Sequence, residues 1–229
     1  MELLRLAERF VAARFPSVDI AVVGGSTSRG TRTATSDIDL LLIGDHAVTD
    51  GRTSLAATYA FEGEPIEVFA YTPAAFEEWA QSGLAQFRPV ILDLLLEGTP
   101  LRDTPALRDL RIHWRPIFDA GPSAEQHELD LRRYAVTDLI DDLRDAADDL
   151  ERAVIAFTLF KRLAELLLIS NGCWIGTGKH LPRRLREWDA ERTEALAQPL
   201  LARDFDAFAG QAARELELLG GRLQTGFVR

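Results

Sequence analysis

Two aspartates separated by one residue are the side chains in this sequence best suited to chemistry. Asp37 and Asp39 stand at the start of the apolar run from Leu40 to Ile43. Because successive side chains of a β-strand point to opposite faces, both carboxylates should project to one side and Ile38 to the other. Mg²⁺ prefers a few carboxylate oxygens, keeps several waters and leaves positions open for substrate phosphates. The pair therefore predicts a Mg²⁺ site, although an isolated Asp-x-Asp more often marks a solvated strand edge.

A glycine-rich turn comes before this strand and offers complementary groups. Gly24 and Gly25 permit a positive φ or a close approach to a ligand, and Ser26 adds a hydroxyl donor. Arg29 and Gly30 extend the turn with a cation and a second permissive backbone position. Gly-Gly-Ser by itself usually marks only a turn. Followed by the two aspartates and flanked by apolar strands, it predicts a phosphate-binding loop beside the metal site.

This combination resembles the signature of the nucleotidyltransferase superfamily, which includes DNA polymerase β, kanamycin nucleotidyltransferase and the minimal nucleotidyltransferases. The resemblance covers roughly the first third of the chain and rests on Gly25, Ser26, Arg29, Gly30, Ser36, Asp37, Asp39 and Leu40. It implies a mixed sheet with flanking helices, two Mg²⁺ ions on three carboxylates, and transfer of a nucleoside monophosphate from an NTP to an acceptor. In such a site the protein mainly positions the reacting groups.

The resemblance also implies a third carboxylate on a later strand, and Glu67 is the best candidate. It lies in the alternating run P-I-E-V-F-A-Y, on the face opposite to the small apolar residues. Leu55 to Phe61 is expected to form the preceding antiparallel strand, with Glu62 to Pro65 as the hairpin connection. Glu62 and Glu64 are weaker candidates because they fall in this turn. The family more often has aspartate at this place, and Glu67 could instead be an ordinary exposed strand residue.

Length and composition limit the class of protein. A chain of 229 residues with 47% hydrophobic residues has room for two domains or one large one, each with a packed core. The single cysteine, Cys173, excludes an internal disulfide, and the scattered histidines suggest no zinc site. The first residues form an amphipathic pattern rather than a signal peptide, and no apolar run is long enough to cross a bilayer. We therefore expect a globular cytoplasmic protein.

The net charge of −10 bears on the partners. A protein that neutralises many phosphates of a polymer normally presents a basic face, so nucleic acid is disfavoured, although local patches can outweigh the net value. The basic cluster from Lys179 to Arg186 is enough for one triphosphate and too short for a nucleic-acid track. The expected partners are an NTP, with ATP favoured, and a small-molecule acceptor.

Two segments rich in glycine or proline, Glu97 to Pro105 and Arg115 to Ser123, interrupt the chain. They place a boundary near residue 112, with a nucleotidyltransferase-like domain at 1–112 and a helical bundle at 113–229, an α+β protein overall. In the first domain, Thr72 and Pro73 are expected to begin one helix, and a second is expected at about 87–96.

Beyond Ser123 the pattern is helical. Apolar residues at steps of three and four predict one face of a single long helix, formed by Val136, Ile140, Leu143, Ala147, Leu150, Val154 and Phe157. The segment 156–169 is apolar nearly all round, so a second helix, or the continuation of this one past a bend, should lie inside the bundle. Amphipathic segments at about 191–201 and 204–219 complete it, ended by Gly220 and Gly221.

The long helix also carries an acidic stripe formed by Asp138, Asp141, Asp145 and Asp148, with Asp142 and Asp149 beside it. Such a stripe is usually a solvated face. If it faces the site, it could bind a cationic acceptor such as an aminoglycoside, and Asp138, Asp141 or Asp142 could accept the proton of the attacking hydroxyl. Resemblance to the aminoglycoside enzymes implies a base in the helical domain. Glu165 is another candidate, although an ion pair with Lys161 explains it more simply.

Lys179 follows two glycines in W-I-G-T-G-K-H-L-P. This segment resembles the G-K-x-L-P segment of several small-molecule nucleotidyltransferases. Lys179 could therefore reach the β- and γ-phosphates as a point charge, or it could be an ordinary loop lysine.

The leading hypothesis is a nucleotidyltransferase that moves AMP from an NTP to a hydroxyl of a small molecule. Mg²⁺ would be held by Asp37, Asp39 and Glu67, and the nucleotide would be contacted by Gly25, Ser26, Arg29 and Lys179. The alternative is a toxin–antitoxin-type or regulatory nucleotidyltransferase that modifies a partner protein, against which the added helical domain argues. The intact Asp-x-Asp argues against a degenerate binding module. The acceptor, the general base and the oligomeric state stay open.

Overall fold

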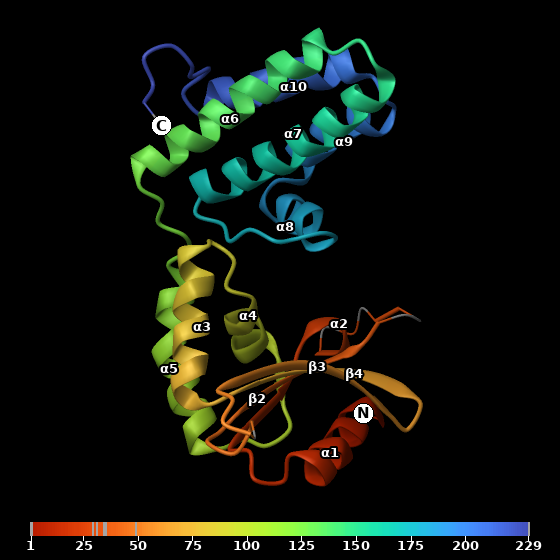
Figure 1. The fold of residues 1–229 in the computed structure, drawn as a ribbon, viewed down its shortest axis with the longest axis vertical. Helices are drawn as coiled ribbons and strands as arrows, with labels where there is room; N and C mark the ends of the chain where they lie inside the picture. Colours follow the sequence, from red (N-terminus) through yellow and green to blue (C-terminus); the bar gives the residue numbers. More distant parts are fainter. Residues whose placement is uncertain (1, 29, 31, 34–35, 49, 229) are drawn as a thin grey trace. The chain divides into compact units, whose positions relative to one another are not determined.

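The structure is a computed structural model that describes residues 2–28, 30, 32–33, 36–48 and 50–228. The chain divides into two compact units, Met1–Ala120 and Gly121–Arg229. The first contains a sheet with helices, and the second, among its described residues, is helical (Figure 1). The predicted α+β class, with a mixed-sheet domain followed by a helical one, is confirmed.

The first unit is built on a mixed sheet with the strand order β3-β4-β2-β1-β5. Its strands are β1 (Ile20–Val23), β2 (Ile38–Ile43), β3 (Ser54–Phe61), β4 (Glu64–Tyr71) and β5 (Thr99–Pro100). Strands β2 and β4 run parallel to each other, and the other paired strands run antiparallel. Because this parallel pair lies inside the sheet, helices can cover it on both faces.

Side chains that alternate along β2 divide the core of the first unit into two layers. Leu40 and Leu42 pack with the helix α1 on one face, and Leu41 and Ile43 pack with α3, α4 and α5 on the other. These helices are α1 (Glu2–Arg14), α3 (Pro73–Ala85), α4 (Val90–Glu97) and α5 (Pro105–Asp119). We call the two sides of the sheet the α1 face and the α3–α5 face. Asp39 is in phase with Leu41, so it belongs to the α3–α5 face.

The hairpin between β3 and β4 is tighter than the sequence predicts. Glu62 and Gly63 have φ values of 50° and 87°, which make them the two central residues of the turn. Phe61 pairs with Glu64 across the hairpin, so the expected four-residue connection at 62–65 is wrong and Glu64 already belongs to β4. The predicted antiparallel pairing itself is confirmed.

The helices of the α3–α5 face begin largely where their caps predict. The side chain of Thr72 accepts a hydrogen bond from Ala75 N, with Pro73 at the first helical position, as predicted. The second predicted helix starts later than expected, at Val90, because Phe87 has a φ of 58° that no α-helix can contain.

The predicted boundary at residue 112 falls inside α5. That helix is capped by Thr104, whose side chain accepts from Leu107 N at 3.2 Å. Leu107 and Trp114 are buried in the core of the α3–α5 face, so the whole helix belongs to the first unit. The units accordingly divide after the helix, at Ala120.

The second unit packs α6, α7, α9 and α10 together, with α8 against α7 and α9. These helices are α6 (Gln126–Asp145), α7 (Asp149–Ser170), α8 (His180–Trp188), α9 (Ala190–Leu201) and α10 (Phe205–Leu218). The last two match the predicted segments closely, and Gly220 and Gly221 follow with φ values of 100° and 75°. No helix among the described residues has the length and hydropathy needed to cross a membrane.

The single long helix predicted beyond Ser123 is wrong. Helix α6 stops at Asp145, Ala146 takes an extended conformation, and the side chain of Asp148 caps α7 by accepting from Leu150 N and Glu151 N. The break resets the helical phase, so the predicted face does not continue. Three of its members are exposed instead of buried, namely Leu150 (73%), Val154 (59%) and Phe157 (59%). The acidic stripe also loses Asp148, which is a helix cap.

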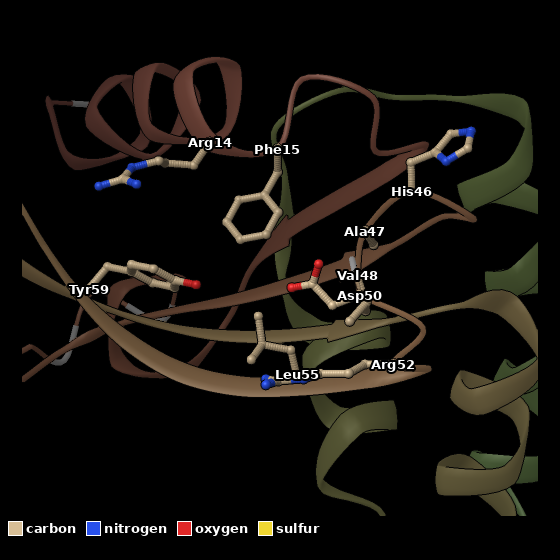
Figure 2. A pocket seen from close by; sticks show the side chains of 9 residues that line it. All are labelled: Arg14, Phe15, His46, Ala47, Val48, Asp50, Arg52, Leu55 and Tyr59. Atoms are coloured by element: carbon tan, nitrogen blue, oxygen red, sulfur yellow. The ribbon is translucent and has the colours of Figure 1, made fainter.

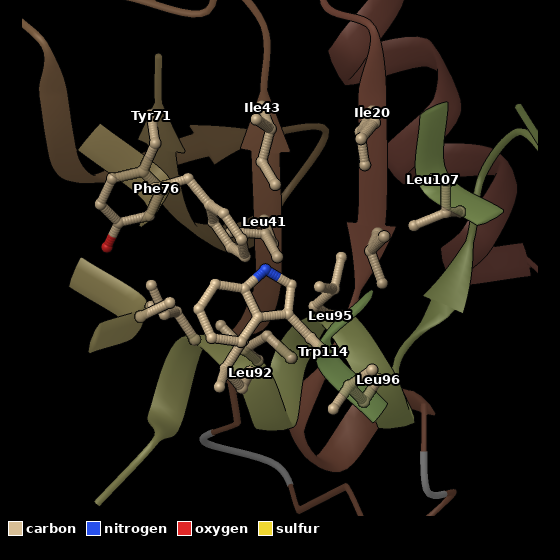
Figure 3. Packing of buried hydrophobic residues seen from close by; sticks show 14 of the residues in the cluster. Ile20, Leu41, Ile43, Tyr71, Phe76, Leu92, Leu95, Leu96, Leu107 and Trp114 are labelled. Atoms are coloured by element: carbon tan, nitrogen blue, oxygen red, sulfur yellow. The ribbon is translucent and has the colours of Figure 1, made fainter. Parts of the chain in front are cut away.

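Trp114 provides a test of the core. It is fully buried, with its ring centre 6.4 Å from that of Phe76. Figure 3 shows it among the side chains of this core. Its indole N–H finds no hydrogen-bond partner among the described residues. Trp114→Ala should therefore cost about 3–5 kcal/mol of unfolding free energy because it leaves a large cavity. Trp114→Phe should cost clearly less, because it leaves a smaller cavity and removes an unpartnered donor. Urea unfolding of both variants measures this, and equal losses would contradict it.

Candidate active site

The glycine loop after β1 is anchored to the strand that carries the two aspartates. Gly24 N donates to the carbonyl oxygen of Asp39 at 2.9 Å. The short helix α2 (Gly25–Ser28) follows directly, and the Thr27 hydroxyl donates to the carbonyl oxygen of Asp37 at 3.5 Å. These bonds fix the loop against the start of β2.

The two glycines are required for different steric reasons. Gly25 has a φ of 61°, and a Cβ at this position would stand 1.6 Å from Asp39 Oδ2. A Cβ on Gly24 would stand 2.2 Å from Leu94 Cδ2, in the helix α4. Gly24 thus lets a helix approach the loop, whereas Gly25 makes room for a carboxylate. The Asp39 side chain therefore lies directly against the loop backbone, in space that any other residue at position 25 would fill.

The structure brings Asp39 and Glu67 together. They are Cα partners in the parallel pairing of β2 and β4, and Asp37 lies two residues before Asp39. All three side chains are half-buried. The alternate residues beside them, among them Ile38 and Ile66, are fully buried on the α1 face. We call Asp37, Asp39 and Glu67 the carboxylate cluster.

The surroundings of the cluster change the pKa of Glu67. Its pKa is raised above the usual value, first by burial and then by repulsion from Asp39 and Asp37. Close carboxylates that repel one another gain from a shared cation, and carboxylate oxygens are the donors that hard divalent cations prefer. The donor set therefore fits such an ion. Among the described residues, however, no three His, Cys, Asp or Glu side chains are grouped closely enough to hold a metal. The metal-binding role of the cluster stays a prediction.

Arg32 is a residue of the site that the sequence reasoning missed. Its guanidinium donates to the carbonyl oxygen of Ser36, at 3.1 Å from Nε and 2.8 Å from Nη2, and also to the carboxylate of Glu64. Ser36 is buried, and its hydroxyl oxygen accepts from Thr33 N at 2.9 Å. Arg32 thereby ties the segment that leads into Asp37 to the start of β4. Nothing in the sequence indicates this contact, because Glu64 is 32 residues from Arg32 and was expected to lie in the turn.

Of the other side chains predicted to contact phosphate, the structure describes Ser26 and Lys179. Ser26 lies in α2 and is half-buried. Arg29 lies outside the described residues. Lys179 belongs to the second unit, where it is exposed and precedes α8. Their roles in nucleotide binding stay predictions.

The candidate bases of the second unit differ in their surroundings. Asp141 accepts from both Nη atoms of Arg222, at 2.9 and 2.5 Å, and from Gln224. The bond from Arg222 lowers the pKa of Asp141, which makes it a poor base. Asp138 and Asp142 are exposed.

Glu165 is buried, at 6% exposure. Its Oε2 lies 3.6 Å from Nη1 of Arg132 and 3.6 Å from Nη1 of Arg162. The predicted pairing with Lys161 is therefore wrong, because the partners come from the neighbouring helix α6 and from three residues earlier in α7. Held by two guanidinium groups, Glu165 is explained as a structural carboxylate.

The steric role of Gly25 can be tested against a matched glycine. Gly63 also has a positive φ, 87°, but a Cβ there would meet nothing within 4 Å. Gly25→Ala and Gly63→Ala should share the cost of a left-handed residue, about 1–2 kcal/mol. Gly25→Ala should cost more in urea unfolding, because the new Cβ displaces the Asp39 carboxylate. Adding Asp39→Ala should remove this excess. An excess that persists in the double variant would contradict the proposed clash.

The raised pKa of Glu67 predicts a pH-dependent effect on stability. The unfolded chain titrates near the usual value of 4.5 and the folded protein above it, so ionisation of Glu67 lowers stability as the pH rises through this interval. Glu67→Gln should therefore stabilise the metal-free protein at neutral pH, by up to about 1 kcal/mol for a half-exposed group, and not in acid.

Urea unfolding in the presence of a chelator measures this effect. Glu64→Gln is the control with the opposite sign, since it breaks the ion pair with Arg32. A Glu67→Gln variant less stable than the wild type at neutral pH would contradict the account.

Comparison with known proteins agrees with this geometry. Residues 4–92, which run from α1 through the carboxylate cluster to α4, match the nucleotidyltransferase domain family. A solved structure of a nucleotidyltransferase-like protein from Exiguobacterium sibiricum is similar at a TM-score of 0.49 with 16% sequence identity, over 95% of this chain and 74% of that one. No curated protein matches the chain. Members of the family generally use divalent metal ions. Residues 4–92 of the chain are thus a nucleotidyltransferase domain.

Proposed function

We propose that the protein is a Mg²⁺-dependent enzyme that transfers a nucleoside monophosphate, AMP from ATP, to a hydroxyl of a small-molecule acceptor. The observation that carries the proposal is the pairing of Asp39 with Glu67 beside a loop in which Gly25 leaves room for a carboxylate. Its position within the nucleotidyltransferase domain supports the same reading.

In this proposal Asp37, Asp39 and Glu67 would hold Mg²⁺, which would supply positive charge against the phosphates and against the oxygen of the attacking hydroxyl. The chain's own residues hold these groups in place. Gly25 keeps the loop backbone open beside Asp39, the Ser26 hydroxyl donates to a phosphate oxygen, and Arg32 ties the approach to Asp37 to the start of β4.

The charge of the cluster explains why binding of the nucleotide should require a metal. Without a cation, three carboxylates would face a triphosphate of the same sign. Burial, and then repulsion within the cluster, already raise the pKa of Glu67. A divalent ion reverses the local potential. We therefore expect little ATP binding in the presence of a chelator.

The proposed acceptor is small because the chain carries a net charge of −10 and only one basic cluster in its sequence. Asp138 and Asp142 of α6 are exposed, and a role for either as the general base stays a prediction. Asp141 is disfavoured by its bonds to Arg222. A cytoplasmic location is part of the proposal and is supported by the lone Cys173.

Transfer to a partner protein is the second candidate function. The observation that favours it is the exposed apolar stripe of Leu150, Val154 and Phe157 on α7, because such side chains often mark a surface that binds protein. An acceptor screen that yields only a labelled protein, and no labelled small molecule, would favour this reading.

Asp37→Asn and Asp39→Asn test the proposal. Each removes one negative charge with little change of shape, and each should lower Mg²⁺-dependent ATP binding and nucleotidyl transfer by about 100-fold or more. Asp45→Asn makes the same change at an exposed position just beyond β2 and should leave both unchanged.

Calorimetry of ATP with and without Mg²⁺ measures binding, and release of pyrophosphate with a panel of hydroxylated amines, beginning with aminoglycosides, measures transfer. ATP binding that is independent of Mg²⁺, or equal in Asp39→Asn and Asp45→Asn, would contradict the proposed site. Mg²⁺-dependent ATP binding without transfer to any acceptor of the panel would contradict only the proposal that the acceptor is a small molecule.

A further inference from the structure

A pocket lies on the α1 face of the sheet, away from the carboxylate cluster. It has a volume of about 200 Å³ and lies between the end of α1, the segment that connects β2 to β3, and β3 itself (Figure 2). Its apolar residues Phe15, Leu55 and Tyr59 pack against the core of the α1 face, whereas the cluster belongs to the α3–α5 face. The pocket is therefore separate from the candidate active site.

Cationic side chains gather at this pocket. Arg14, His46 and Arg52 line it and are exposed to solvent. Within the described part of the chain, none of the three has a hydrogen-bond or ion-pair partner, although the Arg14 guanidinium lies 6.0 Å from the centre of the Tyr59 ring. Asp50 is the only acidic side chain among the described residues of the lining, so the two arginines leave an excess of positive charge. In a chain with a net charge of −10, this arrangement favours an anion.

One part of the pocket wall is apolar. The Phe15 ring meets the Tyr59 ring edge-on, with centres 6.2 Å apart and an interplanar angle of 82°. Leu55 of β3 also lines the pocket, as does the buried Ala47. Flat apolar groups suit such walls, while the guanidinium groups of Arg14 and Arg52 can each donate two hydrogen bonds to one carboxylate.

We propose that this pocket binds a small organic anion with a flat apolar body, such as an aromatic carboxylate. The carboxylate contacts Arg14 and Arg52, and the ring lies against Phe15, Tyr59 and Leu55. The volume limits the ligand, because pockets for drug-sized molecules are about 300–1,000 Å³. This binding site is independent of the proposed transferase activity.

Benzoate is the probe for the test, followed by ¹⁵N chemical shifts of the whole chain. Saturable shifts are expected at Phe15, Ala47, Leu55 and Tyr59. Benzyl alcohol and benzylamine keep the ring and replace the carboxylate by a neutral or a cationic group, so they should not bind.

Two variants and a matched control test the charge recognition. Arg14→Gln and Arg52→Gln should each weaken benzoate binding by about tenfold or more, because each removes a charge-assisted hydrogen bond. Arg5→Gln makes the same change at another exposed position of α1 and should bind like the wild type. The altered arginines are exposed, so the variants should fold, which their thermal midpoints check.

Three results would overturn the proposal. The first is the absence of saturable benzoate binding by folded wild-type protein. The second is equal binding of benzyl alcohol, which would show that the walls alone act and that the arginines do not select an anion. The third is equal benzoate affinity in Arg14→Gln, Arg52→Gln and Arg5→Gln.

Discussion

The side-by-side placement of Asp39 and Glu67 on the parallel strands β2 and β4 is the constraint on which the candidate site depends. Like charges next to each other in a sheet are destabilising, and here they add to burial in raising the pKa of Glu67. The fold tolerates this because both strands are buried from their other face, and because Arg32 ties the start of β4 to the chain that enters β2. A divalent cation bound at the cluster would relieve this repulsion.

The loop and the strand depend on each other through Gly25. Its positive φ turns the chain out of β1, and its missing side chain leaves space that the Asp39 carboxylate occupies. The backbone bond from Gly24 to Asp39 holds this arrangement. The glycine loop and the start of β2 thus form one steric unit.

The sequence predicted features that arise from local periodicity. Alternation along β2 and β4 assigned Asp37, Asp39 and Glu67 to one face, and the Thr72–Pro73 pair predicted the start of α3. Features set by distant contacts were not predictable in this way. Arg32 forms an ion pair with Glu64 at the start of β4. Glu165 pairs with Arg132 of α6, and not with Lys161 of its own helix.

The prediction of one long helix failed for a related reason. Apolar residues continue at steps of three and four through the break between α6 and α7, so the spacing does not reveal the break. Asp148 can lie within a helix or cap one, and the sequence does not decide between the two. The consequence is an exposed stripe on α7 where a buried face was expected.

Whether the carboxylate cluster is a cation site can be measured by ¹⁵N spectra of the intact chain with substoichiometric Mn²⁺. If the cluster binds the ion, paramagnetic broadening should appear first at the amides of Gly25, Asp39 and Glu67. Broadening that begins instead at Asp138 and Asp142 of α6, or no specific broadening, would contradict it.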